Sequence, residues 1–315
     1  MDNKIIHLLE AAVKKRQTLR KYTNALRLVN GVGDGLNGLV LEQYDRHFAA
    51  HIFNKRWLAE KEFLTAFVKK HFAAKYLIAK DRTQATALHP DKIKSDLWIK
   101  EDQSHTIVQE NDLKFAVDLN DGLNSGLFLD MRRNRKIVAG LAKGRKVLNC
   151  FAYTCSFGVY CRKGAAASVV NVDVSRKSLE RGRGNYELNH IKPGPDDFTR
   201  ADAMQYLKLA VKKDNRFDVI ILDPPSFARH EGKTFSVKKD LAVLIDWAIK
   251  VLNPNGVLFA STNFSGMSPQ YIEKMVRVAA PGRRINKIRH LGQDDDFPGS
   301  GLTAESSLSA VLAQL

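Results

Sequence analysis

The stretch FDVIILDPPSFAR, residues 217–229, joins a buried-strand pattern to an acid, two prolines and an aromatic residue. Residues 219–222 form an uninterrupted β-branched and aliphatic run, which is typical of a strand covered on both faces in a parallel sheet. Asp223 follows at the carboxyl end of that strand, where open α/β sheets bind their ligands. The stretch therefore predicts an α/β fold in which the loop after this strand holds a ligand.

The chain carries a large positive charge. Its 315 residues have a net charge of +16. This favours a polyanionic partner, nucleic acid first, and the alternative is a basic protein without such a partner. No segment is long and apolar enough to span a membrane, and the N-terminus lacks a secretory signal pattern. We therefore expect a cytoplasmic protein that binds no membrane and is either a monomer or a homodimer.

The three cysteines, Cys150, Cys155 and Cys161, fall within one short segment. Their spacing matches neither a disulfide framework nor a zinc site, so we expect reduced thiols and no metal. Cys150 and Cys161 are interpreted as packing residues.

The N-terminal part contains two recognisable patterns. Residues 5–22 place apolar side chains at helical spacing with basic residues crowded in the second half, which predicts a basic amphipathic helix. That basic face either contacts RNA phosphate or is the solvent-exposed side of a packed helix. Residues 30–53, NGVGDGLNGLVLEQYDRHFAAHIF, predict a small antiparallel hairpin. Its glycines are assigned to turns, because no helix opens after them as a phosphate loop requires.

From about residue 145 strands and helices alternate, which predicts a parallel sheet covered on both faces. The last two candidate strands, residues 285–291 and 307–315, are joined by a loop without a helix, so we expect one antiparallel edge strand. The predicted organisation is a basic helix at 1–26, a small α+β domain at 27–118 and the large α/β domain at 119–315.

Polar groups follow four of the predicted parallel strands. They are residues 149–157, Asp173, Asp202 and Asp223. Right-handed connections bring these strand ends to one edge of the sheet, where a single ligand can meet all of them. Asp173 is placed to accept hydrogen bonds from ribose hydroxyls, and Asp202 from an adenine amine. The alternative for each acid alone is an ordinary helix cap.

The turn after the first of these strands, FAYTCSFG, contains no G-x-G-x-x-G. A dinucleotide would need that turn for its pyrophosphate. A ligand with a ribose and an adenine but no phosphate, S-adenosylmethionine, fits the remaining groups.

The sequence resembles the class I S-adenosylmethionine-dependent methyltransferases of the bacterial large-subunit ribosomal RNA type. The resemblance is carried by GLFLDMRRNR (126–135), LNCFAYTCSFG (148–158), VVNVDVSRKSLERGRGNYELN (169–189), RADAMQYL (200–207) and VIILDPPSFAR (219–229). Residues 31–45 resemble the central domain of that family. The resemblance implies a methyltransferase fold and methyl transfer to RNA, which is expected to be large-subunit ribosomal RNA.

The resemblance also implies which residues contact the cofactor. Asp173 is expected to bind the ribose, Asp202 to lie by the adenine, the 149–157 loop to wrap the methionine part, and Phe128, Asp130 and Arg132 to close over it. The full expected set is Phe128, Asp130, Arg132, Asn149, Phe151, Ala152, Tyr153, Thr154, Ser156, Phe157, Asp173, Val174, Ser175, Asp202, Ala203 and Asp223.

The sequence departs from the family pattern at three points. The basic helix stands where members usually begin with a small PUA domain. Cys155 replaces a glycine, which adds a side chain where the backbone would approach the cofactor. The stretch after the fifth strand, FASTNFSGM (259–267), has no cysteine such as the carbon-5 methyltransferases of the family carry.

The missing cysteine favours nitrogen over carbon 5 as the methyl acceptor, because carbon 5 of a pyrimidine requires covalent activation by a thiolate. We expect Asp223 and the carbonyls of Pro224 and Pro225 to accept hydrogen bonds from the target base, Phe227 to stack on it, and Asn263 to add an amide contact. The alternatives are a core plug for Phe227 and a loop cap for Asn263. For the whole protein, the alternatives are a small-molecule or protein methyltransferase, or a nonenzymatic RNA-binding factor.

Overall fold

The computed structural model describes residues 3–85, 92–122, 124–230, 233–299 and 308–315. The chain forms two compact units, the first from residues 1–130 and 294–306 and the second from 131–293 and 307–315. The predicted three-part division, with boundaries after residues 26 and 118, stays a prediction. None of the helices in the described ranges combines the length and the apolar character needed to cross a membrane.

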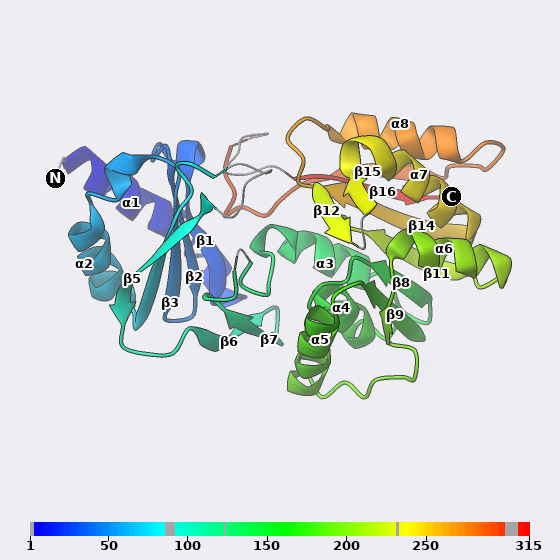
Figure 1. Cartoon of the computed structure of the whole chain (residues 1–315), viewed down its shortest axis with the longest axis horizontal. Coiled ribbons are helices and arrows are strands. Elements are labelled where there is room, and N and C mark those ends of the chain that lie inside the picture. Colours follow the sequence, from blue (N-terminus) through cyan, green and yellow to red (C-terminus); the bar gives the residue numbers. More distant parts are fainter. Residues whose placement is uncertain (1–2, 86–91, 123, 231–232, 300–307) are drawn as a thin grey trace. The chain divides into compact units, whose positions relative to one another are not determined.

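The first unit contains a five-stranded sheet in the order β1-β2-β3-β4-β5 (Figure 1). Its strands are β1 (Ala25–Asn30), β2 (Leu39–Tyr44), β3 (His47–Ile52), β4 (Tyr76–Asp81) and β5 (Lys94–Lys100). β2 and β3 form the predicted antiparallel hairpin, and β3 pairs in parallel with β4 through the crossover helix α2 (Lys61–Phe72). β6 (His105–Glu110) and β7 (Leu113–Asp118) form a separate antiparallel hairpin. Short 3-10 turns complete the unit: η1 (Leu19–Lys21), η2 (Gly31–Asp34), η3 (Lys55–Trp57) and, where the chain passes to the second unit, η5 (Leu129–Met131).

The apolar face of this sheet packs against α1 (Asn3–Lys15) and α2. The predicted basic helix is therefore packed through one face, and it ends at Lys15, before η1, rather than running to residue 22. Arg16, expected among its basic surface residues, is fully buried and donates to both Asp34 oxygens at 2.7 and 2.6 Å. Tyr22, expected on the apolar face, is 57% exposed. Helical periodicity missed both because the helix has already ended there.

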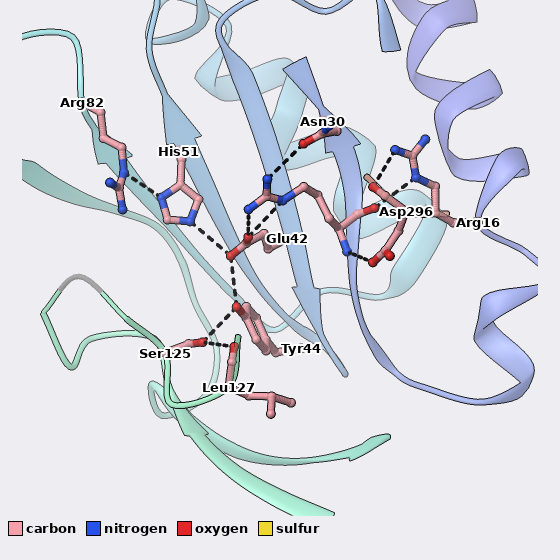
Figure 2. A network of polar contacts seen from close by, with 10 residues as sticks. Arg16, Asn30, Glu42, Tyr44, His51, Arg82, Ser125, Leu127 and Asp296 are labelled. Carbon is pink, nitrogen blue, oxygen red and sulfur yellow. Dashed lines mark hydrogen bonds and ion pairs between the residues drawn. The ribbon is translucent and has the colours of Figure 1, made fainter. Parts of the chain in front are cut away.

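The opposite face of the same sheet carries a buried polar network centred on Glu42 (Figure 2). Glu42 accepts hydrogen bonds from Arg27, from the Tyr44 hydroxyl at 3.0 Å and from His51 Nε2 at 3.2 Å. Arg82 Nε donates to His51 Nδ1 at 3.0 Å, so the network assigns the His51 proton to Nε2. Burial lowers the pKa of His51. Burial alone would raise the pKa of Glu42, but Arg27 and His51 hold that pKa well below its usual range.

A segment from far along the chain completes the first unit. Asp296 is fully buried, and its carboxylate accepts from the backbone N–H of Arg27 at 2.9 Å. Asn30 Nδ2 donates to the Pro298 carbonyl at 2.9 Å. That carbonyl oxygen lies so close to Gly33 that a Cβ there would be 1.9 Å from it, which explains the glycine by close approach.

The second unit is built on a seven-stranded sheet in the order β10-β9-β8-β11-β14-β16-β15 (Figure 1). Its strands are β8 (Lys146–Cys150), β9 (Ser168–Asp173), β10 (Phe198–Arg200), β11 (Phe217–Leu222), β14 (Leu252–Thr262), β15 (Lys287–Leu291) and β16 (Ser309–Gln314). Its helices are α3 (Arg132–Ala139), α4 (Ser156–Lys163), α5 (Arg176–Leu188), α6 (Ala203–Lys212), α7 (Val237–Lys250) and α8 (Pro269–Ala279). The predicted α/β class is confirmed.

The sequence predicted that the antiparallel strand would lie at an edge of this sheet, and this prediction is wrong. The antiparallel strand, β16, lies between β14 and β15. Helix α8 connects β14 to β15, which is not the neighbour of β14 but the edge strand one position further out. The position between β14 and β15 is therefore open for the last strand. The returning chain fills that gap and runs antiparallel to both neighbours.

Both faces of the second sheet are buried, as the opening stretch predicted. Val219 and Ile221 belong to one core with residues of α3 and α4, whereas Ile220 and Leu222 belong to another with residues of α6, α7 and α8. Successive strand residues point to opposite faces, so a doubly covered strand needs apolar residues at every position.

Candidate active site at the carboxyl edge of the sheet

The register of the sheet brings the predicted strand-end groups into one row. Val172, Cys150, Leu222 and Ala260 are successive partners across β9, β8, β11 and β14. The next residue on each strand therefore belongs to the same edge, namely Asp173, Phe151, Asp223 and Ser261. On the outer side, Arg200 of β10 pairs with Asp173, and Asp202 follows.

The loop after β8 has an unusual backbone. Phe151, Tyr153 and Cys155 have φ values of 59°, 48° and 59°, a left-handed conformation that non-glycine residues seldom adopt. The conformation is held by hydrogen bonds from the Tyr153 N–H to Asp173 at 2.8 Å and from Asn185 to the Thr154 carbonyl at 3.0 Å. Such strain persists only where surrounding contacts enforce it, and it concentrates at functional sites.

Asp173 is half-buried at the carboxyl end of β9. Its two oxygens accept the backbone N–H groups of Ser175 and Tyr153, both at 2.8 Å. Burial raises the pKa of Asp173, although these backbone donors favour its ionised form. A carboxylate has about four acceptor sites, so capacity remains for a ligand hydroxyl.

The two helices beside this edge begin with capping side chains. Ser175 caps α5 by accepting from the Ser178 N–H at 3.1 Å. Asp202 caps α6 by accepting from the Gln205 N–H at 2.9 Å through one oxygen. The capping alternative therefore applies to Asp202, and its other oxygen is not engaged in that bond. Val174 is half-buried and Ala203 is buried beside them.

The loop at residues 223–227 is joined to the end of β14 by two side-chain hydrogen bonds. Ser261 Oγ donates to Asp223 Oδ1 at 2.7 Å, and Ser226 Oγ donates to Asn263 Oδ1 at 2.6 Å. Pro224 is buried and Pro225 is exposed. Half-buried Phe227 begins a small hairpin of β12 (Phe227–His230) and β13 (Lys233–Ser236).

Sequence reasoning missed Ser226 and Ser261. Their partners lie 37 and 38 residues away, so no local pattern reports the pairing. Only Ser261 gave a local signal, because it stands inside the apolar run GVLFASTN (256–263), where a buried hydroxyl needs a hydrogen-bond partner.

Several predicted cofactor residues lie inside the second unit's core. Asn149 is buried, and its Nδ2 donates to Asn171 Oδ1 at 2.8 Å. Phe157 packs on Phe259 with ring centroids 5.4 Å apart, and Ala152 and Thr154 are also buried. Ser156 is half-buried at the start of α4. As cofactor contacts these residues stay predictions.

The segment with Phe128, Asp130 and Arg132 spans the division between the two units. In the first unit Phe128 is 39% exposed and Asp130 is half-buried in η5. In the second unit Arg132 is buried in the first turn of α3. Their closing role over the cofactor stays a prediction.

Cys155 is fully buried, and its side chain packs against α5. A Cβ added to Gly182 would lie 2.4 Å from its Sγ, so the absence of a side chain at Gly182 makes room for the thiol. All three cysteines are free and buried. Burial raises the pKa of each thiol, that of Cys161 to about 12, so the nucleophilic thiolate is suppressed. Within the described part of the chain, no three His, Cys, Asp or Glu side chains are grouped as a metal site.

Comparison with known proteins agrees with the fold described above. Residues 54–312 match the S-adenosylmethionine-dependent methyltransferase family model. The chain is 35% identical over 299 residues to YwbD of Bacillus subtilis, a candidate ribosomal RNA large subunit methyltransferase, covering 93% of this chain and 75% of that protein. It is 31% identical over 289 residues to the ribosomal RNA large subunit methyltransferase I of Aeromonas salmonicida, covering 90% and 72%. The crystal structure of SMU.776, a candidate methyltransferase complexed with SAH (S-adenosylhomocysteine), superposes with a TM-score of 0.87 and 28% identity over 99% of this chain and 81% of that one.

Proposed function

The chain belongs to the S-adenosylmethionine-dependent methyltransferase family, and on this premise we propose that it methylates a base nitrogen in large-subunit ribosomal RNA. The observation that carries the proposal is the strand-end row that holds both Asp173 after β9 and Asp223 after β11, with Phe227 following in the loop that Asp223 begins. The relatives' names and the net charge of +16 support RNA as the acceptor.

The second unit fits the cofactor. Asp173 offers an ionisable, half-buried acceptor for ribose hydroxyls, and the free oxygen of the Asp202 cap offers one for an adenine amine. Val174 and Ala203 would supply apolar contact to the adenine. The strained 151–155 backbone would hold the methionine part. When bound, S-adenosylmethionine supplies an electrophilic methyl group on a sulfonium.

Residues of the second unit would present the acceptor base. Asp223 and the carbonyls of Pro224 and Pro225 would accept hydrogen bonds from the base and orient it. The Asp223 carboxylate would receive the proton that leaves the methylated nitrogen. Phe227 stacks on the base after it leaves its helix. Asn263 adds a side-chain amide contact.

The cysteines support nitrogen over carbon 5. Carbon-5 methylation requires a thiolate that adds to the pyrimidine ring. No cysteine follows Cys161 in the sequence, and the three that exist are buried with raised pKa values. A nitrogen acceptor needs only alignment and a proton acceptor.

Two measurements test the proposal. Calorimetric titration with S-adenosylhomocysteine tests the cofactor, and tritiated methyl transfer to unmodified large-subunit RNA tests the acceptor. We expect binding and label in RNA, with methylated nitrogen in the digested nucleosides. Binding together with turnover on proteins or small molecules, and none on RNA, would contradict the RNA proposal. A C5-methylated pyrimidine would contradict the nitrogen assignment.

The stacking role of Phe227 has its own test. Phe227→Leu keeps an apolar side chain and removes the ring, so we expect methyl transfer to fall while S-adenosylhomocysteine binding is kept. The matched control is Phe264→Leu, another half-buried phenylalanine that packs on the core after β14. Equal activity of both variants would support the core-plug alternative.

A further inference from the structure

Ser261 is a buried polar side chain at the end of β14 that the mechanism above does not use. It is 0% exposed and lies inside β14, directly after the apolar residues 257–260. Its hydroxyl lies 2.7 Å from Asp223 Oδ1 and 3.3 Å from the Leu222 carbonyl. A hydroxyl has a single proton, and the shorter contact to an ionised acceptor is the stronger one, so the proton belongs to the Asp223 bond.

The register of the sheet brings Ser261 and Asp223 next to each other. Leu222 and Ala260 are direct partners in the parallel pairing of β11 with β14. Asp223 and Ser261 are the next residues on the two strands, so they share one row and one face of the sheet. Ser261 is also held from its other side, where it is paired with Ala310 of β16. The donor is therefore fixed by strands on both sides, whereas Asp223 stands at the start of a loop.

We propose that Ser261 is a positioning residue for the methyl-transfer step, which orients the Asp223 carboxylate through Oδ1 and directs Oδ2 to the base. The inference rests on the proposed function of Asp223. A carboxylate that ends a strand can rotate about its side-chain bonds, and a charge-assisted hydrogen bond from a rigid donor selects one rotamer before the base arrives. Ser261 touches neither the base nor the cofactor in this assignment.

The second bond of the loop supports the same arrangement. Ser226 Oγ donates to Asn263 Oδ1 at 2.6 Å, which ties the far end of the 223–227 loop to the residues after β14. The loop is thus joined to β14 near both of its ends. Occupation of Asn263 Oδ1 turns the Nδ2 donors of this amide toward other partners.

The test compares Ser261→Ala with the matched control Ser309→Ala. Ser309 is a 1% exposed serine on the neighbouring strand β16, and its Oγ donates to the Met267 carbonyl at 2.7 Å, not to a carboxylate. We expect Ser261→Ala to lower kcat for RNA methylation about tenfold, with the affinity for S-adenosylhomocysteine unchanged. Ser309→Ala should keep kcat within about twofold, and Ser261→Thr should restore most of it because the hydroxyl is kept.

Two further readouts separate positioning from folding. Loss of a donor to the ionised carboxylate favours its protonated form, so the acid limb of the pH profile of kcat should move to higher pH in Ser261→Ala. Carbon-13 NMR titration of the Asp223 carboxyl, which needs no substrate, should show the same direction.

An unchanged Asp223 titration, or an equal loss of kcat in Ser309→Ala, would overturn the inference. If the wild-type protein transfers no methyl group to RNA, the RNA proposal fails on that ground. The NMR titration would still decide whether Ser261 holds Asp223.

Discussion

The effect of Gly182→Ala on the free energy of unfolding should change sign with the residue at position 155. Gly182 lies inside α5, and a Cβ there would be 2.4 Å from Cys155 Sγ, 3.0 Å from Cys155 Cβ and 3.3 Å from Phe198 Cε1. Cys155 is enclosed, so its thiol has no room to retreat. In the Cys155→Gly background the two closest atoms disappear, and only the Phe198 ring edge remains as a tight neighbour.

The magnitude follows from two opposed terms. Gly→Ala in a helix interior gains about 1 kcal/mol of helix propensity. Overpacking a closed core costs about 1–3 kcal/mol. We therefore expect Gly182→Ala to destabilise the wild-type chain by up to about 2 kcal/mol and to stabilise the Cys155→Gly chain. The coupling between the two substitutions should be about 1–3 kcal/mol.

Urea and thermal unfolding of the four chains, followed by circular dichroism, measure this coupling. The control is Gly184→Ala in the same helix, where a Cβ meets nothing within 4 Å, so the substitution should stabilise both backgrounds equally. Additive effects of Gly182→Ala and Cys155→Gly, within about 0.5 kcal/mol, would refute the steric reasoning. Because the thiol packs on α5, Cys155→Gly should change the S-adenosylhomocysteine affinity by less than about threefold.

Four other outcomes can be measured. Asp173→Asn should weaken S-adenosylhomocysteine binding by at least about tenfold, because a charged acceptor is lost, and calorimetry showing unchanged affinity would remove the ribose assignment. In the wild-type chain that affinity should fall as the pH is lowered toward the raised pKa of Asp173, because the protonated carboxyl is a poorer acceptor. Burial lowers the pKa of His51, so the unfolded chain binds the proton first, and the contribution of His51 to stability is present above its ordinary pKa of 6.5 and is lost as the pH falls below it. The urea midpoint should therefore depend less on pH in His51→Gln than in wild type. Asp34→Asn leaves the buried Arg16 guanidinium with a neutral partner and should cost about 3–5 kcal/mol in unfolding free energy, whereas Asp246→Asn, at an exposed pair with Lys250, should cost less than about 1 kcal/mol.

The parallel sheet was predictable because its signal is local. The apolar run at 219–222 and the regular alternation after residue 145 report burial on both faces, and the structure places strands at each expected segment. The position of β16 was not predictable from such signals. A strand's neighbours depend on which gap the preceding crossover leaves, and the connection from Leu291 to Ser309 permits either an edge or an internal position for β16.

For the candidate site, the acids after the strands were predictable and their partners were not. Strand periodicity with right-handed connections is enough to gather Asp173, Asp202 and Asp223 at one edge. The bonds of Ser261 and Ser226 to that loop join residues 37 and 38 positions apart, and nothing in either local stretch encodes the other.

By itself the sequence determined the fold class, the succession of strands and helices along the second unit and the chemical kind of the ligand, because periodicity and strand-end residue types act over a few neighbouring positions. Only the tertiary structure determined that the Cys155 side chain packs against α5 and that Arg16 is buried. It also determined that Asp296 completes the first unit by accepting a hydrogen bond from Arg16, which lies 280 residues earlier in the chain. These outcomes depend on which surfaces meet after the chain has closed its long loops, and that choice is made by packing and by the need to pair buried polar groups.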